Sequence, residues 1–202
     1  SVELLEGWLE SGQGPWGEPR LQARFLLGWL YLQANDPNNA SPQFTKVRLQ
    51  ESPLQSLALW YEASSDHQRG RHRPAIKECE EYRTLWPDGE HSGNCLLLIG
   101  QAQKALGQNS TARDTWAQWI AENPEHPRLP QVALNRTIAK AELGSQQAVR
   151  ALQNTSLHPD YPTLGQQATA TLSALRQQGR SLPEIDPLDQ SIAEINRLVA
   201  TG

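Results

Sequence analysis

The chain of 202 residues contains two cysteines, five histidines and 22 carboxylate side chains, the residue types most able to carry chemistry. His67 and His72 are five positions apart around Gly70, whereas two metal ligands on one helix face are four apart. Two cysteines without a nearby histidine do not supply the four ligands of a zinc site. We therefore predict no metal site, and we interpret the histidine pair as part of a solvated, basic turn.

The carboxylates occur in small groups, namely Glu78, Glu80 and Glu81; Asp88 and Glu90; and Glu122 and Glu125. A catalytic carboxylate of a glycosidase needs an apolar cleft that raises its pKa. These groups fall on expected helix surfaces and turns, so we interpret them as solvated. The sequence also lacks a Gly-x-Ser-x-Gly elbow, a His-Glu-x-x-His motif, a phosphate loop and a dinucleotide fingerprint. We predict no catalytic residue and no cofactor, and hence that this chain is not an enzyme.

Composition narrows the class of partner. The chain has 18 basic and 22 acidic residues and a formal net charge of -4, which argues against nucleic acid, because phosphate binding needs a concentrated basic excess. The longest strongly apolar stretch, Phe25 to Leu32, is far shorter than the roughly 20 residues that cross a bilayer. We therefore expect no transmembrane segment.

Small residues recur along the chain at spacings of 35 and 37 positions. They indicate the helices that must position any functional site. Two sets show this spacing, the first Gly28, Ala63 and Gly100, and the second Ala40, Ala75 and Ala112. Large residues follow the second set four positions later, and Pro87 and Pro124 end two of the units. A small residue suits a close helix crossing, and proline ends a helix. Each unit thus fits two helices joined by a short turn, and one such hairpin buries its apolar face only in a stack.

This pattern resembles the tetratricopeptide (TPR) repeat, most clearly from Leu96 to Pro124. The consensus places there are occupied by Gly100, Gly107, Ala112, Trp116 and Pro124. The resemblance implies an all-α, right-handed α-solenoid of TPR-like helical hairpins. In the fourth unit Thr137 stands at the small position and Ala148 lies one residue early, so its register is less well defined.

Three parts of the chain are predicted. Residues 1–20 form an N-terminal helix and connector, 21–162 form about four TPR-like hairpins, and 163–202 form C-terminal helices. The last part comprises helices at Thr163–Gln178 and Leu188–Ala200, with the linker Gly179–Pro187 between them. The final helix has no partner after it and the chain has no Met, so we expect a segment of a longer protein that continues after Gly202.

The concave face is the best candidate binding site, because first-helix positions not used for packing line it in such solenoids. Five residues have this register: Trp60, Ser64, His67, Gln101 and Lys104. An aromatic ring among polar groups suits a sugar or a peptide. For Trp60 the alternative is a place in the core between repeats, which we favour.

Four stretches of the sequence extend the resemblance. They are Ala23–Val47, Ser52–Gly89, "HPDYPT" (His158–Thr163) and the closing "DQSIAEINRLVATG". Their succession resembles the helical-repeat N-terminal region of soluble lytic murein transglycosylases. That family's catalytic Glu-Ser motif, followed by a Gly-Leu-Met-Gln-like segment, does not occur in this chain.

The resemblance implies a periplasmic, cell-envelope location and a non-catalytic scaffold. Such a scaffold would bind a protein partner, or position the glycan or peptide of peptidoglycan, for a lytic transglycosylase. The alternative is a stand-alone envelope TPR adaptor that mediates protein–protein interactions.

Cys79 and Cys95 are expected on two helices that pack together, the second of one hairpin and the first of the next. Their Cα atoms could then come within the roughly 4.4–6.8 Å that a disulfide requires. An oxidising compartment would favour the bond. The alternative is two reduced, buried thiols that act as small hydrophobic side chains.

Overall fold

The computed structural model describes residues 2–12, 16–158, 161–184 and 191, and all the regular structure in them is helical. The helices are α1 (Val2–Glu10), α2 (Glu18–Gln33), α3 (Pro37–Arg48), α4 (Gln55–Gln68), α5 (His72–Leu85), α6 (Ser92–Ala105), α7 (Asn109–Glu122), α8 (Leu129–Glu142), α9 (Gln146–Leu157) and α10 (Pro162–Gln177). The all-α class is confirmed. The helix predicted over Leu188–Ala200 lies outside the described residues.

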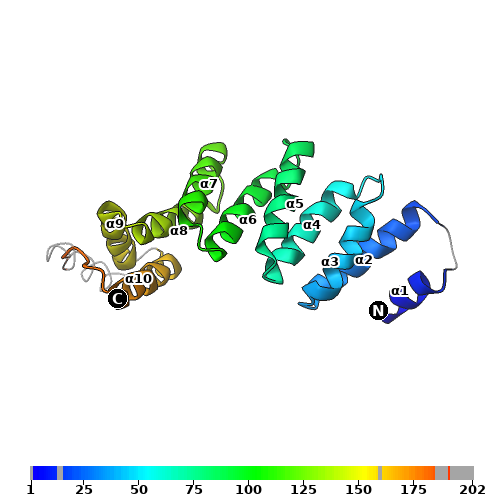
Figure 1. Cartoon of the computed structure of the whole chain (residues 1–202), viewed down its shortest axis with the longest axis horizontal. Helices are drawn as coiled ribbons and strands as arrows, with labels where there is room; N and C mark the ends of the chain where they lie inside the picture. The colour runs from blue at the N-terminus through cyan, green and yellow to red at the C-terminus, as the bar shows by residue number, and fades with distance from the viewer. Residues whose placement is uncertain (1, 13–15, 159–160, 185–190, 192–202) are drawn as a thin grey trace, which may run out of the picture. The chain divides into compact units, whose positions relative to one another are not determined.

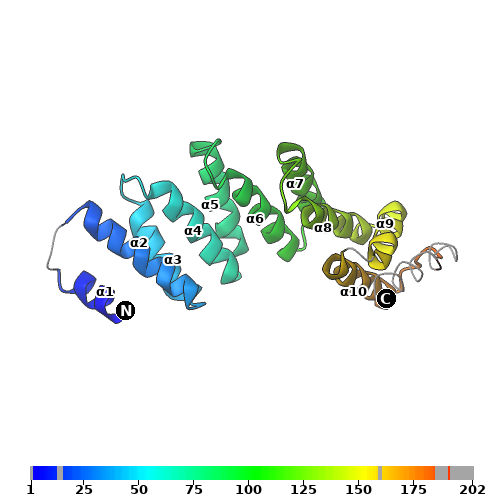
Figure 2. The same ribbon diagram turned by 180° about the vertical axis from the view of Figure 1, so that it is seen from behind.

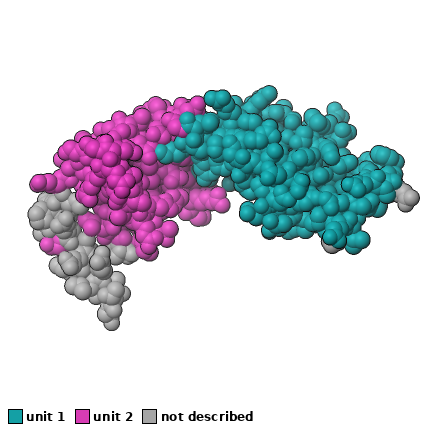
Figure 3. Space-filling view, turned by 60° about the horizontal axis from the view of Figure 1, so that its bottom comes forward, with its two compact units in different colours: residues 1–106 teal, residues 107–202 magenta. Residues whose placement is uncertain are grey.

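The chain divides into two compact units, residues 1–106 and residues 107–202 (Figure 3). In the first unit α2 to α6 lie side by side in chain order, and the view from behind shows the same order (Figures 1 and 2). Each helix packs on the next along the chain, and α4 also contacts both α2 and α6. In the second unit α8, α9 and α10 pack in the same manner, with α8 also touching α10.

Four turns between described helices each contain one residue in the left-handed region of backbone space. The φ angles are 56° at Asn35, 74° at Gly70, 74° at Gly107 and 96° at Gly144. Glycine reaches this region without steric cost, and asparagine is the side-chain-bearing residue that tolerates it best. The turns therefore recur at the spacing of the sequence repeat. In the fourth hairpin Ala148 and Val149 are both buried, so Val149 occupies the register position that alanine holds elsewhere.

The small residues of the repeat lie where helices cross. A Cβ atom on Gly28 would stand 2.9 Å from Cζ of Phe44 and 3.2 Å from Cβ of Gln43, so α2 and α3 approach each other closely only because position 28 is glycine. Phe44 is fully buried and stacks on Tyr61 of α4 with ring centroids 5.4 Å apart. The aromatic core thereby joins the first hairpin to the second.

None of the described helices combines the length and the apolar character needed to cross a membrane.

Candidate functional site

The residues predicted to line a binding face lie on two adjacent helices of the first unit. Trp60, Ser64 and His67 follow one face of α4, because their spacings of four and three residues match the helical period. Gln101 and Lys104 share a face of α6, which contacts α4. Gln101 is exposed and the other four are half-buried.

The indole of Trp60 has a packing role. It lies against the buried cluster that includes Leu59 and Cys95, and it stacks on the imidazole of His91 with ring centroids 5.2 Å apart and planes 17° apart. Burial lowers the pKa of His91, which favours the neutral form of the stacked imidazole. Trp60 is therefore held in place by its neighbours, with part of its surface left accessible.

His67 and His72 are closer than their sequence positions suggest. The turn at Gly70 brings their Nδ1 atoms to 3.1 Å, a hydrogen bond in which one ring donates and the other accepts. Burial, with a smaller contribution from the charge of His72, lowers the pKa of His67. The pair is thus partly buried, whereas we predicted a solvated turn. Among the described residues no group of three or more histidine, cysteine or carboxylate side chains could hold a metal ion.

Two carboxylates on the opposite side of α4 are almost fully buried, with Glu62 5 % and Asp66 2 % exposed. Glu62 accepts hydrogen bonds from the Thr45 hydroxyl at 2.7 Å and from Arg48 Nε. Both donors come from α3, so this contact joins α3 to α4.

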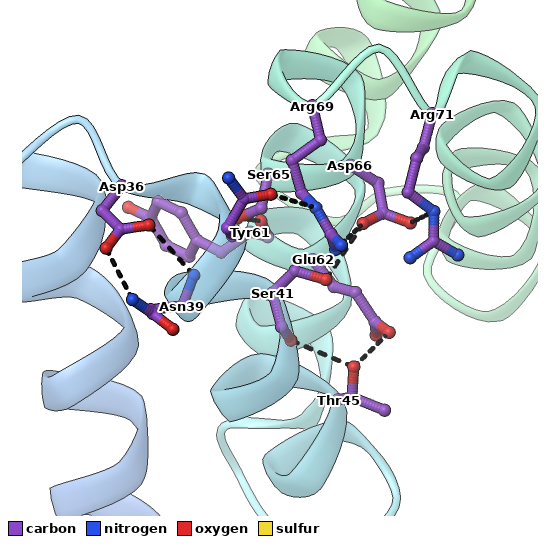
Figure 4. Close-up of polar contacts among 11 residues, drawn as sticks. Asp36, Asn39, Ser41, Thr45, Tyr61, Glu62, Ser65, Asp66, Arg69 and Arg71 are labelled. Carbon is purple, nitrogen blue, oxygen red and sulfur yellow. Dashed lines mark hydrogen bonds and ion pairs between the residues drawn. The ribbon is translucent and has the colours of Figure 1, made fainter. Parts of the chain in front are cut away.

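Asp66 extends this contact toward α5 (Figure 4). It accepts from the Ser41 hydroxyl of α3 at 3.0 Å and from Arg69 Nη1 at 3.0 Å, and it pairs with Arg71 Nε at 3.5 Å. We call Glu62, Asp66 and these donors the buried acidic ladder. We did not predict this ladder from the sequence, although two acids four residues apart in a helix with an apolar face were a signal for it.

Glu78 on α5 differs most from its predicted solvated state. Burial raises its pKa to about 8, and the negative charges of Glu62 and Asp66 contribute to this rise. Its Oε2 atom is buried and has no hydrogen-bond partner within the described residues. The side chain lines a cavity of about 530 Å³ together with Arg48, Arg73, Pro74, Lys77 and Glu81. The raised pKa favours the neutral, protonated form of Glu78, which lessens repulsion from the ladder.

Cys79 and Cys95 come together as their helices pack. Both are free thiols, both are fully buried, and they belong to one apolar cluster. A hydrogen bond to Cys95, together with burial, holds the pKa of the Cys79 thiol well above its usual value. Full burial keeps both side chains from solvent, and the disulfide between them stays a prediction.

Comparisons with known proteins agree with the helical-repeat fold described above. Residues 94–126 match the tetratricopeptide repeat family. The structure described as "Crystal structure of MamA" is similar to this chain with a TM-score of 0.58 and 14 % identity, over 88 % of this chain and 86 % of that chain. The chain therefore has a TPR-like helical-repeat fold.

Two structures from Podosopora anserina support the same fold. Both are described as "putative kinesin light chain nearly identical TPR-like repeats", and one of them carries a single substitution. The substituted form has a TM-score of 0.60 and 18 % identity, over 87 % of each chain. The other has a TM-score of 0.56 and 16 % identity, over 89 % of this chain and 87 % of that one. No curated protein sequence matches the chain, and none of these similar structures links it to lytic murein transglycosylases.

Proposed function

We propose that the chain is a protein–protein interaction scaffold and that the face formed by Ser64 and His67 of α4 with Gln101 and Lys104 of α6 binds the partner. The observation that carries this proposal is the repeat itself: TPR-like hairpins leave the same face of neighbouring first helices available to an extended ligand. Extended polypeptides suit such a surface, because it offers polar groups at regular intervals along one direction.

The buried acidic ladder gives this face a fixed orientation. Glu62 and Asp66 are two residues from Trp60 and Ser64 along the chain, which places them on the other side of the helix. Their bonds to α3 and to Arg71 fix the rotation of α4 about its own axis. A preorganised face loses less conformational freedom when a partner binds.

Site-specific photocrosslinking in cells tests this proposal. Benzoylphenylalanine would replace Ser64 in one variant, Gln101 in a second, and exposed Glu80 on α5 in a control. We expect Ser64 and Gln101 to crosslink to the same protein and Glu80 not to do so. Crosslinks of equal yield at all three positions, or none at Ser64 and Gln101, would refute a binding face on α4 and α6.

A finer assignment rests on the sequence stretches described above and on no other finding. We propose that the scaffold belongs to a periplasmic, cell-envelope protein and serves as the docking or substrate-positioning part of a peptidoglycan lytic transglycosylase. Co-sedimentation with purified peptidoglycan sacculi and fractionation of the source cells test this assignment. Recovery from the cytoplasmic fraction with no sedimentation would refute it, and would leave the protein-binding scaffold standing. Periplasmic recovery without sedimentation would favour the stand-alone adaptor.

A further inference from the structure

Arg20, at the start of α2, is a buried cation with incomplete partners. Its side chain is only 8 % exposed, its Nη2 donates to the Leu9 carbonyl of α1, and its Nη1 has no hydrogen-bond partner among the described residues. The guanidinium lies over the rings of Trp8 and Trp16, at 5.6 and 4.6 Å from their centroids. These ring contacts offset part of the cost of burying the charge, but they leave one donor open.

Arg20 lines a cavity of about 380 Å³ between the start of α2 and the end of α3. The other lining residues are Trp16, Gly17, Leu21, Arg24, Lys46, Leu49 and Gln50. Three of these eight residues are cationic and none is acidic. Burial and the charge of Arg20 both lower the pKa of Arg24, so the cavity holds like charges near one another without a counter-charge in its lining.

Among the described residues, no ion pair joins Arg20, Arg24 or Lys46 to a carboxylate. Glu6 of α1 accepts a hydrogen bond from the hydroxyl of Tyr31, and Arg24 donates to the amide oxygen of Gln43 at 3.4 Å. The rim is also apolar, because Trp16 is 73 % and Leu49 65 % exposed. A ligand that completes the site must therefore bring both negative charge and an apolar group.

We propose that this cavity, the α2–α3 basic pocket, binds an acidic segment of a partner protein in which a carboxylate stands next to a large apolar residue. The carboxylate would meet the positive charges of Arg20, Arg24 and Lys46, while the apolar side chain covers Trp16 and Leu49. A free inorganic anion would satisfy the charges but leave that apolar rim uncovered. The inference rests on the proposed scaffold function and adds the chemistry of the ligand.

Fluorescence anisotropy with three labelled 12-residue peptides tests the pocket: alternating Asp and Leu, alternating Asn and Leu, and alternating Asp and Ser. We expect the Asp–Leu peptide to bind at least tenfold more tightly than either of the others, and its affinity to fall as NaCl is raised, since exposed charge pairs are screened. The double variant Arg24→Gln with Lys46→Gln should weaken its binding at least tenfold.

The control removes the same charge elsewhere, with exposed Lys77→Gln on α5 and exposed Arg150→Gln on α9, and should bind as the unaltered chain does. Trp16→Ala provides a second variant at a mostly exposed site, and it should weaken the Asp–Leu peptide more than the Asp–Ser peptide. Arg20 is left unaltered because it holds α1 to α2.

Three results would overturn the proposed binding at the α2–α3 basic pocket. They are equal affinity for the Asp–Leu and Asn–Leu peptides, no binding of the Asp–Leu peptide, and unchanged affinity of the double variant for that peptide. Inorganic phosphate that competes at the same concentration as the peptide would overturn the peptide specificity. Crosslinks at Ser64 and Gln101 that persist in the double variant would show that the scaffold function survives the failure of the pocket.

Discussion

Replacing Glu78 by glutamine should stabilise the protein, and the gain should depend on pH. The native state raises the pKa of this carboxyl from an ordinary value of 4.5 to about 8, through burial and then the charges of Glu62 and Asp66. Folding therefore favours the protonated form. The stability that Glu78 provides is fully present below pH 4.5, is lost as pH rises from 4.5 through 8, and is constant above that. Glutamine has nearly the same shape and does not ionise.

The size of the effect follows from linkage. A carboxyl with a native pKa of about 8 and an unfolded pKa of 4.5 would cost about 3 kcal/mol at pH 7 if the whole shift were realised. Glu78 is only half-buried, and solvent screening lowers this to about 1–2 kcal/mol. At about 2–4 °C per kcal/mol for a chain of this size, the Tm should rise by about 2–8 °C.

Thermal unfolding followed by circular dichroism at pH 4, 5, 6, 7, 8 and 9 measures this difference. The gain of Glu78→Gln over the unaltered chain should be near zero at pH 4, grow through neutral pH and level off above pH 8. Glu80→Gln, two residues away on the same helix and exposed, is the matched control and should change Tm by less than about 1–2 °C at every pH. A gain that is the same at pH 4 and pH 8, or a loss at pH 8, would show that Glu78 is not a buried acid.

Three further predictions concern packing and partners. Gly28→Ala should cost about 1–3 kcal/mol in urea unfolding, because the added Cβ would overlap the aromatic ring that packs across from it; an unchanged midpoint would contradict the close crossing. Arg48→Met should cost about 2–4 kcal/mol by leaving buried Glu62 without its cation, and Glu62→Gln in the same chain should recover part of that loss. A thiol reagent at pH 8 should modify neither Cys79 nor Cys95 in the folded chain and both in denaturant, and no modification in denaturant would instead indicate the disulfide.

Much of the fold could be predicted from sequence, because the residues that define the repeat act on nearby parts of the chain, at turns and at helix crossings. Gly28 and Ala40 lie where α2 and α3 cross, and their small side chains alone indicate a close helix crossing. Gly70 and Gly107 mark turns through their φ angles. These constraints act within one hairpin, so a recurring pattern is enough to reveal them.

The candidate site was less accessible to sequence reasoning, because it depends on which side chains face one another across packed helices. His67 and His72 were interpreted as solvated from their spacing, but the turn between them folds back and joins their rings. Glu78 was grouped with exposed acids, since nothing in its own helix indicates that Glu62 and Asp66 lie across from it. Glu78 is half-buried because α5 packs on α4. The spacing of apolar residues within α5 alone does not reveal that packing.

The restriction of contacts to helices one or two places apart has a consequence for how the chain loses structure. No described helix is closed into a core by a distant segment, so protection from amide hydrogen exchange should vary from hairpin to hairpin. The hydrogen bonds of the ladder hold α4 to α3, so within the first unit amide exchange should be slowest in α4. A partner bound across α4 and α6 would extend this slow region along α6, and hydrogen exchange would then record the footprint of the partner.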